Sequence, residues 1–173
     1  MPILKFSEFS KLIQTQTQSC LIGLDVGTKI VGASITDSSY KIAAPLATLK
    51  RYYENETLFS KQLIPLYKQN KACGLVVGWP ISETNKITKQ CQDILTCVNH
   101  LWMFSQMDIP VYLMDERYTT NMAYEIYNET TTKKTKKIKY KDKLSAILIL
   151  QSFCDKYNHI DNYGDLFNHI QNS

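Results

Sequence analysis

Residues 20–29 read CLIGLDVGTK, an apolar run that ends in an aspartate and a glycine-containing turn. Apolar runs bounded by turn residues are typical of strands inside a covered sheet. We therefore predict a central strand over Cys20–Val26. Asp25 stands out, because an ionised carboxylate in such a strand is costly unless it is paired or bound to a metal. A carboxylate that caps the turn of Gly27 and Thr28 is the simpler alternative.

Four further strands are predicted from the same pattern. Residues 30–36 form the second strand, and residues 40–49 form the third after a turn at Asp37-Ser38-Ser39. Short connections between consecutive strands indicate an antiparallel meander. The fourth and fifth strands are expected at residues 74–79 and 110–115.

Helices are predicted between and after these strands. Residues 57–70 and 83–105 carry apolar side chains at helical spacing, and a further helix is expected at 119–129. Residues 142–157 are apolar nearly all round, which predicts a helix buried against the sheet. The pattern indicates an α/β fold: a five-stranded mixed sheet of order 3-2-1-4-5 with helices on both faces.

The 173 residues suit a single domain over residues 1–173, with a helical N-terminal extension at 1–19 and a polar tail at 158–173. No apolar run approaches the roughly 20 residues of a membrane helix, and the N-terminus lacks the pattern of a secretory signal. The five cysteines are odd in number and none form close pairs, which argues against a zinc site. We expect a cytoplasmic protein that does not bind membranes.

The positive charge is concentrated in one segment. The net charge is +4, and residues 133–143 hold seven lysines and one aspartate, or +6, which leaves −2 for the rest of the chain. Such a patch predicts a polyanionic partner, with Lys133, Lys134, Lys136 and Lys137 as candidate contacts. A solvated loop without a partner is the alternative.

Two acidic residues follow the fifth strand. The sequence Asp115-Glu116-Arg117 begins where that strand ends. The carboxyl ends of parallel strands meet at one edge of a sheet, so this pair is expected near Asp25. Strand alternation leaves open which of Asp115 and Glu116 faces it. Arg117 is a candidate phosphate contact, although we favour its pairing with Asp115.

A fourth acid, Asp142, lies in the first turn of the last helix, where a helix cap alone would explain it. Ser145 and Ala146, one turn on, are small and would let this helix approach the sheet closely. That approach would bring Asp142 towards the other carboxylates.

Converging carboxylates form a hard oxygen site that suits Mg²⁺ or Mn²⁺. Two such ions, about 4 Å apart, can stabilise both oxygens of a phosphodiester displacement. Thr28 and Lys29, in the first hairpin, are candidate phosphate contacts beside them.

Four motifs together resemble the YqgF/RuvX family over roughly residues 18–157. They are GLDVGTK at 23–29, GLVVGWP at 74–80, DERYTT at 115–120 and DKLSAILILQ at 142–151. The resemblance implies an RNase H-like fold and a metal-dependent nuclease. By motif, it assigns the catalytic and metal-binding acids to Asp25, Asp115, Glu116 and Asp142.

Members of that family are described as processing nucleases for the 5′ end of precursor 16S ribosomal RNA, in ribosome biogenesis. They have also been proposed to resolve Holliday junctions. The implied partner is thus structured RNA or branched DNA, bound by a monomer or a weak homodimer.

The chain departs from the family pattern after the fourth strand. Trp79 replaces the usual leucine, and the loop at residues 81–86 is shorter and has no glycine. This loop borders the expected cleft, so substrate fit is the property it would alter.

Two other readings compete with a nuclease. A phosphotransferase of the actin or hexokinase type also uses Asp-x-Gly-Thr, but it needs a second lobe that 173 residues do not supply. A non-catalytic RNA-binding module would use the lysines and exposed tyrosines such as Tyr52, Tyr53 and Tyr140.

Overall fold

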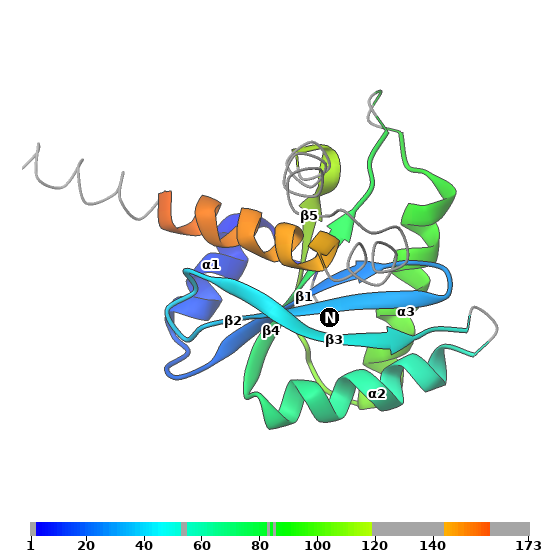
Figure 1. Cartoon of the computed structure of the whole chain (residues 1–173), viewed down its shortest axis with the longest axis horizontal. Coiled ribbons are helices and arrows are strands. Elements are labelled where there is room, and N and C mark those ends of the chain that lie inside the picture. The colour runs from blue at the N-terminus through cyan, green and yellow to red at the C-terminus, as the bar shows by residue number, and fades with distance from the viewer. Residues whose placement is uncertain (1–2, 53–54, 83, 85, 119–143, 160–173) are drawn as a thin grey trace, which may run out of the picture.

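The computed structural model describes residues 3–52, 55–82, 84, 86–118 and 144–159 (Figure 1). Its elements, in chain order, are α1 (Phe6–Gln14), β1 (Cys20–Val26), β2 (Ile30–Thr36), β3 (Ala43–Lys50), α2 (Glu56–Gln69), β4 (Ala72–Trp79), α3 (Lys89–Ser105), β5 (Val111–Asp115), the 3-10 helix η1 (Glu116–Tyr118) and a helix over residues 144–159. The predicted helix at 119–129, the lysine segment, Asp142 and the tail beyond residue 159 lie outside the described residues.

The five strands form one mixed sheet of order β3-β2-β1-β4-β5, which confirms the predicted order. β1 pairs antiparallel with β2, and β2 with β3. β1 pairs parallel with β4, and β4 with β5. The strand that carries Asp25 is therefore central, and its carboxyl end lies beside those of β4 and β5.

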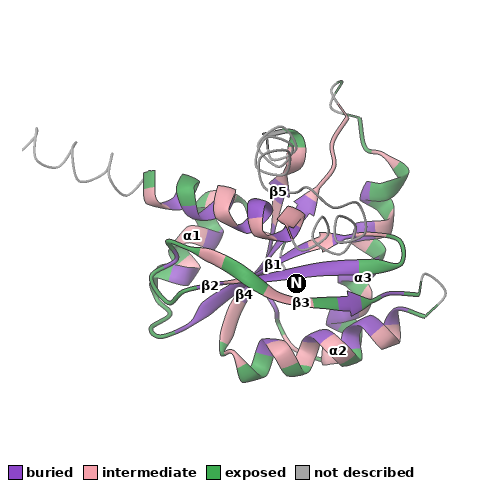
Figure 2. Ribbon diagram, viewed as in Figure 1, coloured by how far each residue is buried: buried purple, intermediate pink, exposed green. Residues whose placement is uncertain are grey.

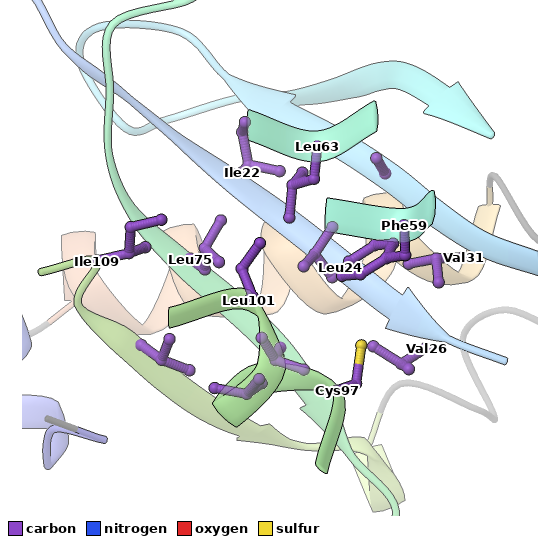
Figure 3. Close-up of a cluster of buried hydrophobic side chains, with 14 of the residues drawn as sticks. Ile22, Leu24, Val26, Val31, Phe59, Leu63, Leu75, Cys97, Leu101 and Ile109 are labelled. Carbon is purple, nitrogen blue, oxygen red and sulfur yellow. The ribbon is translucent and has the colours of Figure 1, made fainter. Parts of the chain in front are cut away.

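One face of the sheet is covered by α2 and α3. Alternation along β1 sends Ile22 and Leu24 to this side, where they pack with Phe59 and Leu63 of α2 and Leu101 of α3 (Figure 3). Burial concentrates in the central strands, as the purple ribbon of Figure 2 shows.

The other face is covered by α1 and by the helix over residues 144–159, drawn in orange in Figure 1. Phe9 and Ile13 of α1 are fully buried there with Phe153. The backbone N–H of Leu4 also donates to the carbonyl of Val111 at 2.8 Å, at the edge strand β5. The helix predicted near the N-terminus is present, and its apolar side chains join the core.

The third strand begins at Ala43, not at Tyr40 as predicted. Tyr40 has a left-handed backbone with φ of 54°. The carboxylate of Asp37 accepts the N–H groups of Lys41 at 2.8 Å and Ile42 at 2.9 Å. This Asp-centred turn holds the chain out of the sheet for three more residues.

The helix predicted from residue 83 begins at Lys89. Thr88 is its N-cap, and its hydroxyl oxygen accepts the N–H of Cys91 at 3.3 Å. Before it, the Ser82 hydroxyl accepts the N–H of Lys86 at 2.8 Å, which stabilises a loop instead of a helical turn.

In the described part of the chain, no helix has the length and apolar character required to cross a membrane. All five cysteines are free thiols, and Cys20, Cys91, Cys97 and Cys154 are buried.

Candidate active site

The carboxyl ends of β1, β4 and β5 bring two acidic side chains together on one face of the sheet. Leu24 and Val26 point into the core under α2 and α3, so Asp25 between them points to the face of the helix over residues 144–159. Glu116 reaches the same face from the start of η1, because its carboxylate lies over Gly78 of β4.

Gly78 makes the position of Glu116 possible. A β-carbon at Gly78 would collide with the Glu116 carboxylate and would lie 2.6 Å from Cδ1 of Ile149. A glycine inside an apolar strand is a known sign of such a close approach. Gly78 is therefore a residue of the site that the sequence could have indicated, as a glycine within the apolar run at residues 74–79.

Burial raises the pKa of Glu116 to about 7, and the negative charges of Asp25 and Asp115 add to the rise. Both causes favour the protonated carboxyl group over the carboxylate. Asp25 is the larger of the two charge contributions, which marks Asp25 and Glu116 as an interacting pair.

Asp115 is held differently, by its neighbour Arg117. The guanidinium Nη2 lies 2.5 Å from Oδ2 of Asp115, and Nε donates to Oδ1 at 3.0 Å and to Oδ2 at 2.9 Å. This hydrogen bonding lowers the pKa of Asp115. The pairing that we favoured for Arg117 is confirmed, and Glu116 is the acid of this pair that lies close to Asp25.

The helix over residues 144–159 approaches the sheet closely where small residues meet. The hydroxyl of Ser34 donates to the carbonyl of Ala146 at 2.7 Å, and Ala146 is fully buried. A β-carbon at Gly23 would lie 2.7 Å from Cβ of Leu150. The predicted close approach at Ala146 is confirmed. Asp142 precedes this helix in sequence but lies outside the described residues.

The hairpin between β1 and β2 presents Thr28 and Lys29 to solvent. The N–H of Gly27 donates to the carbonyl of Ile30 at 3.0 Å, so the backbone itself closes this turn.

A buried arginine, which sequence reasoning missed, fixes this hairpin. Nη1 of Arg51 donates to the carbonyl of Gly27 at 3.1 Å, and Nη2 donates to the carbonyl of Asp93 in α3 at 3.3 Å. Nε donates to Oε1 of Glu56, the first residue of α2, at 2.9 Å. An arginine after a strand usually reads as a surface residue, so no local signal marks this role.

Trp79, where the chain departs from the family pattern, points away from the acids. It follows Gly78 in β4 and packs, partly buried, against the core under α2 and α3. Trp79 therefore does not line the face that carries Asp25 and Glu116.

The described residues contain no group of three or more His, Cys, Asp or Glu side chains arranged to hold a metal ion. Within them the site offers the pair Asp25 and Glu116. Of the candidate contacts, Lys133, Lys134, Lys136 and Lys137 lie outside the described residues.

Comparison with known proteins identifies the family of this chain. The family model described as "RuvX: Holliday junction resolvase" matches residues 19–156. The chain belongs to the YqgF/RuvX family. Membership in this family of nucleases makes it a hydrolase that acts on the phosphodiester bonds of nucleic acid.

Two relatives span nearly the whole chain. A protein of Ehrlichia canis (strain Jake) named "Putative pre-16S rRNA nuclease" is 30% identical over 148 residues, covering 86% of this chain and 91% of its own. One with the same name from Rickettsia canadensis (strain McKiel) is 29% identical over 155 residues, covering 90% and 97%.

Among solved structures, RuvC of Thermus thermophilus superposes with a TM-score of 0.50 at 12% sequence identity. The match covers 80% of this chain and 96% of the RuvC chain. This likeness concerns the fold alone, and it confirms the RNase H-like architecture that the motifs implied.

Proposed function

We propose that this member of the YqgF/RuvX family is a metal-dependent endonuclease that processes the 5′ end of precursor 16S rRNA. Its reaction centre is formed by Asp25 and Glu116, with Asp142 as a third carboxylate. The observation that carries the proposal is the Glu116 carboxylate, which lies over Gly78 and has its pKa raised by burial and by Asp25.

The residues fit a divalent cation. The carboxylates of Asp25 in β1 and Glu116 in η1 point to one face, and their mutual repulsion is the interaction that a bound cation would relieve. Bound Mg²⁺ or Mn²⁺ would supply Lewis acidity to the scissile phosphate and lower the pKa of an attacking water. Asp25 and Glu116 would hold the cation, and Gly78 leaves room for the Glu116 carboxylate.

The remaining residues would bind and orient the substrate. Lys29 and Thr28 lie exposed in the hairpin that follows Asp25, where they can contact phosphate oxygens. Lys133, Lys134, Lys136 and Lys137 would extend this contact along the backbone. Arg117 holds Asp115 in an ion pair, so we assign Asp115 a supporting role beside the metal ligands.

The test is cleavage of a transcript that spans the 5′ end of precursor 16S rRNA. Purified protein should cut it with Mg²⁺ or Mn²⁺ and stop on addition of EDTA. Asp25→Asn and Glu116→Gln should each lower the rate at least about 100-fold, or about 2.7 kcal/mol of barrier. Asp115→Asn, the matched control, removes a neighbouring charge and should stay within about tenfold of the wild-type rate.

Two outcomes would contradict this proposal. Wild-type protein that binds the transcript but never cuts it would support a non-catalytic RNA-binding module. An equal fall of the cleavage rate in Asp115→Asn and Glu116→Gln would refute the assignment of Glu116, rather than Asp115, as the metal ligand.

Branched DNA is the second candidate substrate, because the matching family model is described as a Holliday junction resolvase. A four-way DNA junction assayed beside the RNA transcript, at equal concentration and the same metal, separates the two. Faster cleavage of the junction would favour resolution of recombination intermediates over rRNA processing.

A further inference from the structure

Exposed apolar and basic side chains gather where β2 begins and β3 ends. Ile30 is 39% exposed and Tyr52 is 57% exposed. Lys29 and Lys50 beside them are also exposed. We call Lys29, Ile30, Lys50 and Tyr52 the hairpin surface.

Two members of the hairpin surface, Ile30 and Lys50, share a face of the sheet with Asp25. Ile30 pairs directly with Lys50 across β2 and β3. Their neighbours Val31 and Leu49 point into the core under α2 and α3, so Ile30 and Lys50 point to the opposite face. Asp25 lies on that same face, in the strand next to β2, where it pairs with Gly32.

The backbone under this surface is fixed in place. The N–H of Arg51 donates to the carbonyl of Lys29 at 2.9 Å, and the N–H of Asn55 donates to the carbonyl of Tyr52 at 2.8 Å. The Arg51 side chain, only 2% exposed, is paired with the buried Glu56 and anchors the stretch from below. A backbone that is already held by hydrogen bonds has less freedom to lose on binding than a flexible loop.

We propose that the hairpin surface binds a single-stranded stretch of the substrate next to the bond that is cut. Tyr52 stacks on one base, Lys29 and Lys50 contact phosphates on either side, and Ile30 contacts the sugar between them. An aromatic ring flanked by cations is the usual composition of a single-strand contact, since every base offers a face for stacking. This inference rests on the proposed nuclease function.

The surface also explains which form of nucleic acid would be preferred. Bases inside a duplex are stacked on each other and are not available to Tyr52. A substrate with unpaired nucleotides at the cleavage point would therefore bind more tightly than a continuous duplex of the same length.

The test is binding of a fluorescein-labelled single-stranded RNA in EDTA, followed by fluorescence anisotropy, so that cleavage does not interfere. Tyr52→Ala should raise Kd about tenfold, and Tyr52→Phe, which retains the ring, should bind like the wild type. Lys29→Gln with Lys50→Gln should lower the slope of log Kd against log salt by about 1.4, at roughly 0.7 per phosphate contact.

Two control variants remove one exposed aromatic ring and one exposed lysine at the other end of the sheet. Phe104→Ala removes a ring that is 39% exposed near the end of α3, and Lys68→Gln removes an exposed lysine near the end of α2. Both should bind RNA like the wild type. Thermal unfolding of every variant confirms that binding is compared between folded proteins.

The inference is overturned if Tyr52→Ala binds single-stranded RNA like the wild type. It is also overturned if the substitution lowers the affinity for a continuous RNA duplex by the same factor as the affinity for single-stranded RNA. Failure of the proposed function is a separate observation, because it requires wild-type protein that does not cleave with Mg²⁺ or Mn²⁺. The binding assay and the cleavage assay therefore fail independently.

Discussion

Glu116 and Asp115 are adjacent acids whose surroundings shift their pKa values in opposite directions. Burial and the charge of Asp25 raise the pKa of Glu116, whereas hydrogen bonds from Arg117 lower that of Asp115. The end of β5 causes this separation, because η1 begins at Glu116 and redirects the chain. One residue of the pair thus faces the site, while the other is neutralised beside it.

The raised pKa of Glu116 predicts a pH-dependent stability in the metal-free protein. Its pKa is about 7 in the folded chain against a reference of 4.5, so the folded state binds the proton more tightly. This contribution to the free energy of unfolding is fully present below pH 4.5 and is lost as the pH rises through about 7.

Urea unfolding in EDTA between about pH 5 and about pH 8 measures this dependence. The wild type should lose stability over the range, and Glu116→Gln should flatten the curve because glutamine does not titrate. Added Mg²⁺ should restore stability mainly at the upper end, where the carboxylate is ionised. Identical curves for the wild type and Glu116→Gln would contradict the raised pKa.

At the scale of elements, β1 and β4 are shaped by glycines where other groups approach. Gly23 admits the helix over residues 144–159, Gly74 lies under the ring of Phe9, and Gly78 lies under Glu116. Each close approach leaves no space for a side chain, but only the one at Gly78 involves the site. A substitution at Gly74 can therefore report the effect of overpacking alone, and a substitution at Gly78 reports overpacking together with any effect on the site.

Gly78→Ala and Gly74→Ala form a matched pair. Both add a methyl group to β4, and overpacking of this kind costs about 1–3 kcal/mol of stability. Gly78→Ala should also displace the Glu116 carboxylate, so cleavage and Mn²⁺ affinity should fall at least about tenfold. Gly74→Ala places its β-carbon 2.7 Å from the Phe9 ring. It should leave the cleavage rate and the Mn²⁺ affinity largely intact.

Thermal unfolding, Mn²⁺ titration and the cleavage rate would be measured on both variants. If they lose activity in proportion to stability alone, Gly78 has a packing role and no role in placing Glu116.

At the scale of the molecule, the positive charge is concentrated in one segment and the rest of the chain is slightly acidic. Residues 133–143 carry +6, whereas the rest of the chain carries −2. Asp25 and Glu116 therefore belong to the part of the chain whose net charge is negative, which repels nucleic acid, and the lysines would offset this repulsion. In sequence, the lysine segment directly precedes the helix over residues 144–159, which packs on the same face of the sheet as Asp25.

Replacement of Lys133, Lys134, Lys136 and Lys137 by glutamine should weaken RNA binding most at low salt. The slope of log Kd against log salt should fall by about 3, at roughly 0.7 per lost phosphate contact. The same four-charge change at the exposed Lys11, Lys61, Lys68 and Lys71 keeps the net charge equal and is the control. A slope that falls equally in both variants would show that only overall charge matters.

The sequence by itself determined the order of the strands and the strand that carries Asp25, because apolar runs and turn residues act locally. The bounds of β1 and β2 agree with their prediction, and the four motifs identified the family. The predicted bounds of a strand and a helix were wrong where polar side chains accept hydrogen bonds from backbone N–H groups, as at Asp37 and Ser82.

Only the tertiary structure decided which acid accompanies Asp25. Asp115 and Glu116 are equivalent in sequence, and the choice depends on Arg117, on Gly78 of β4 and on the turn at η1. The role of Arg51 likewise arises from contacts to Gly27, Glu56 and Asp93, which only folding brings together. The physical reason is the same in both cases. A strand pattern fixes which face a side chain takes, but the pKa and partners of a charged group depend on neighbours that are distant in the chain.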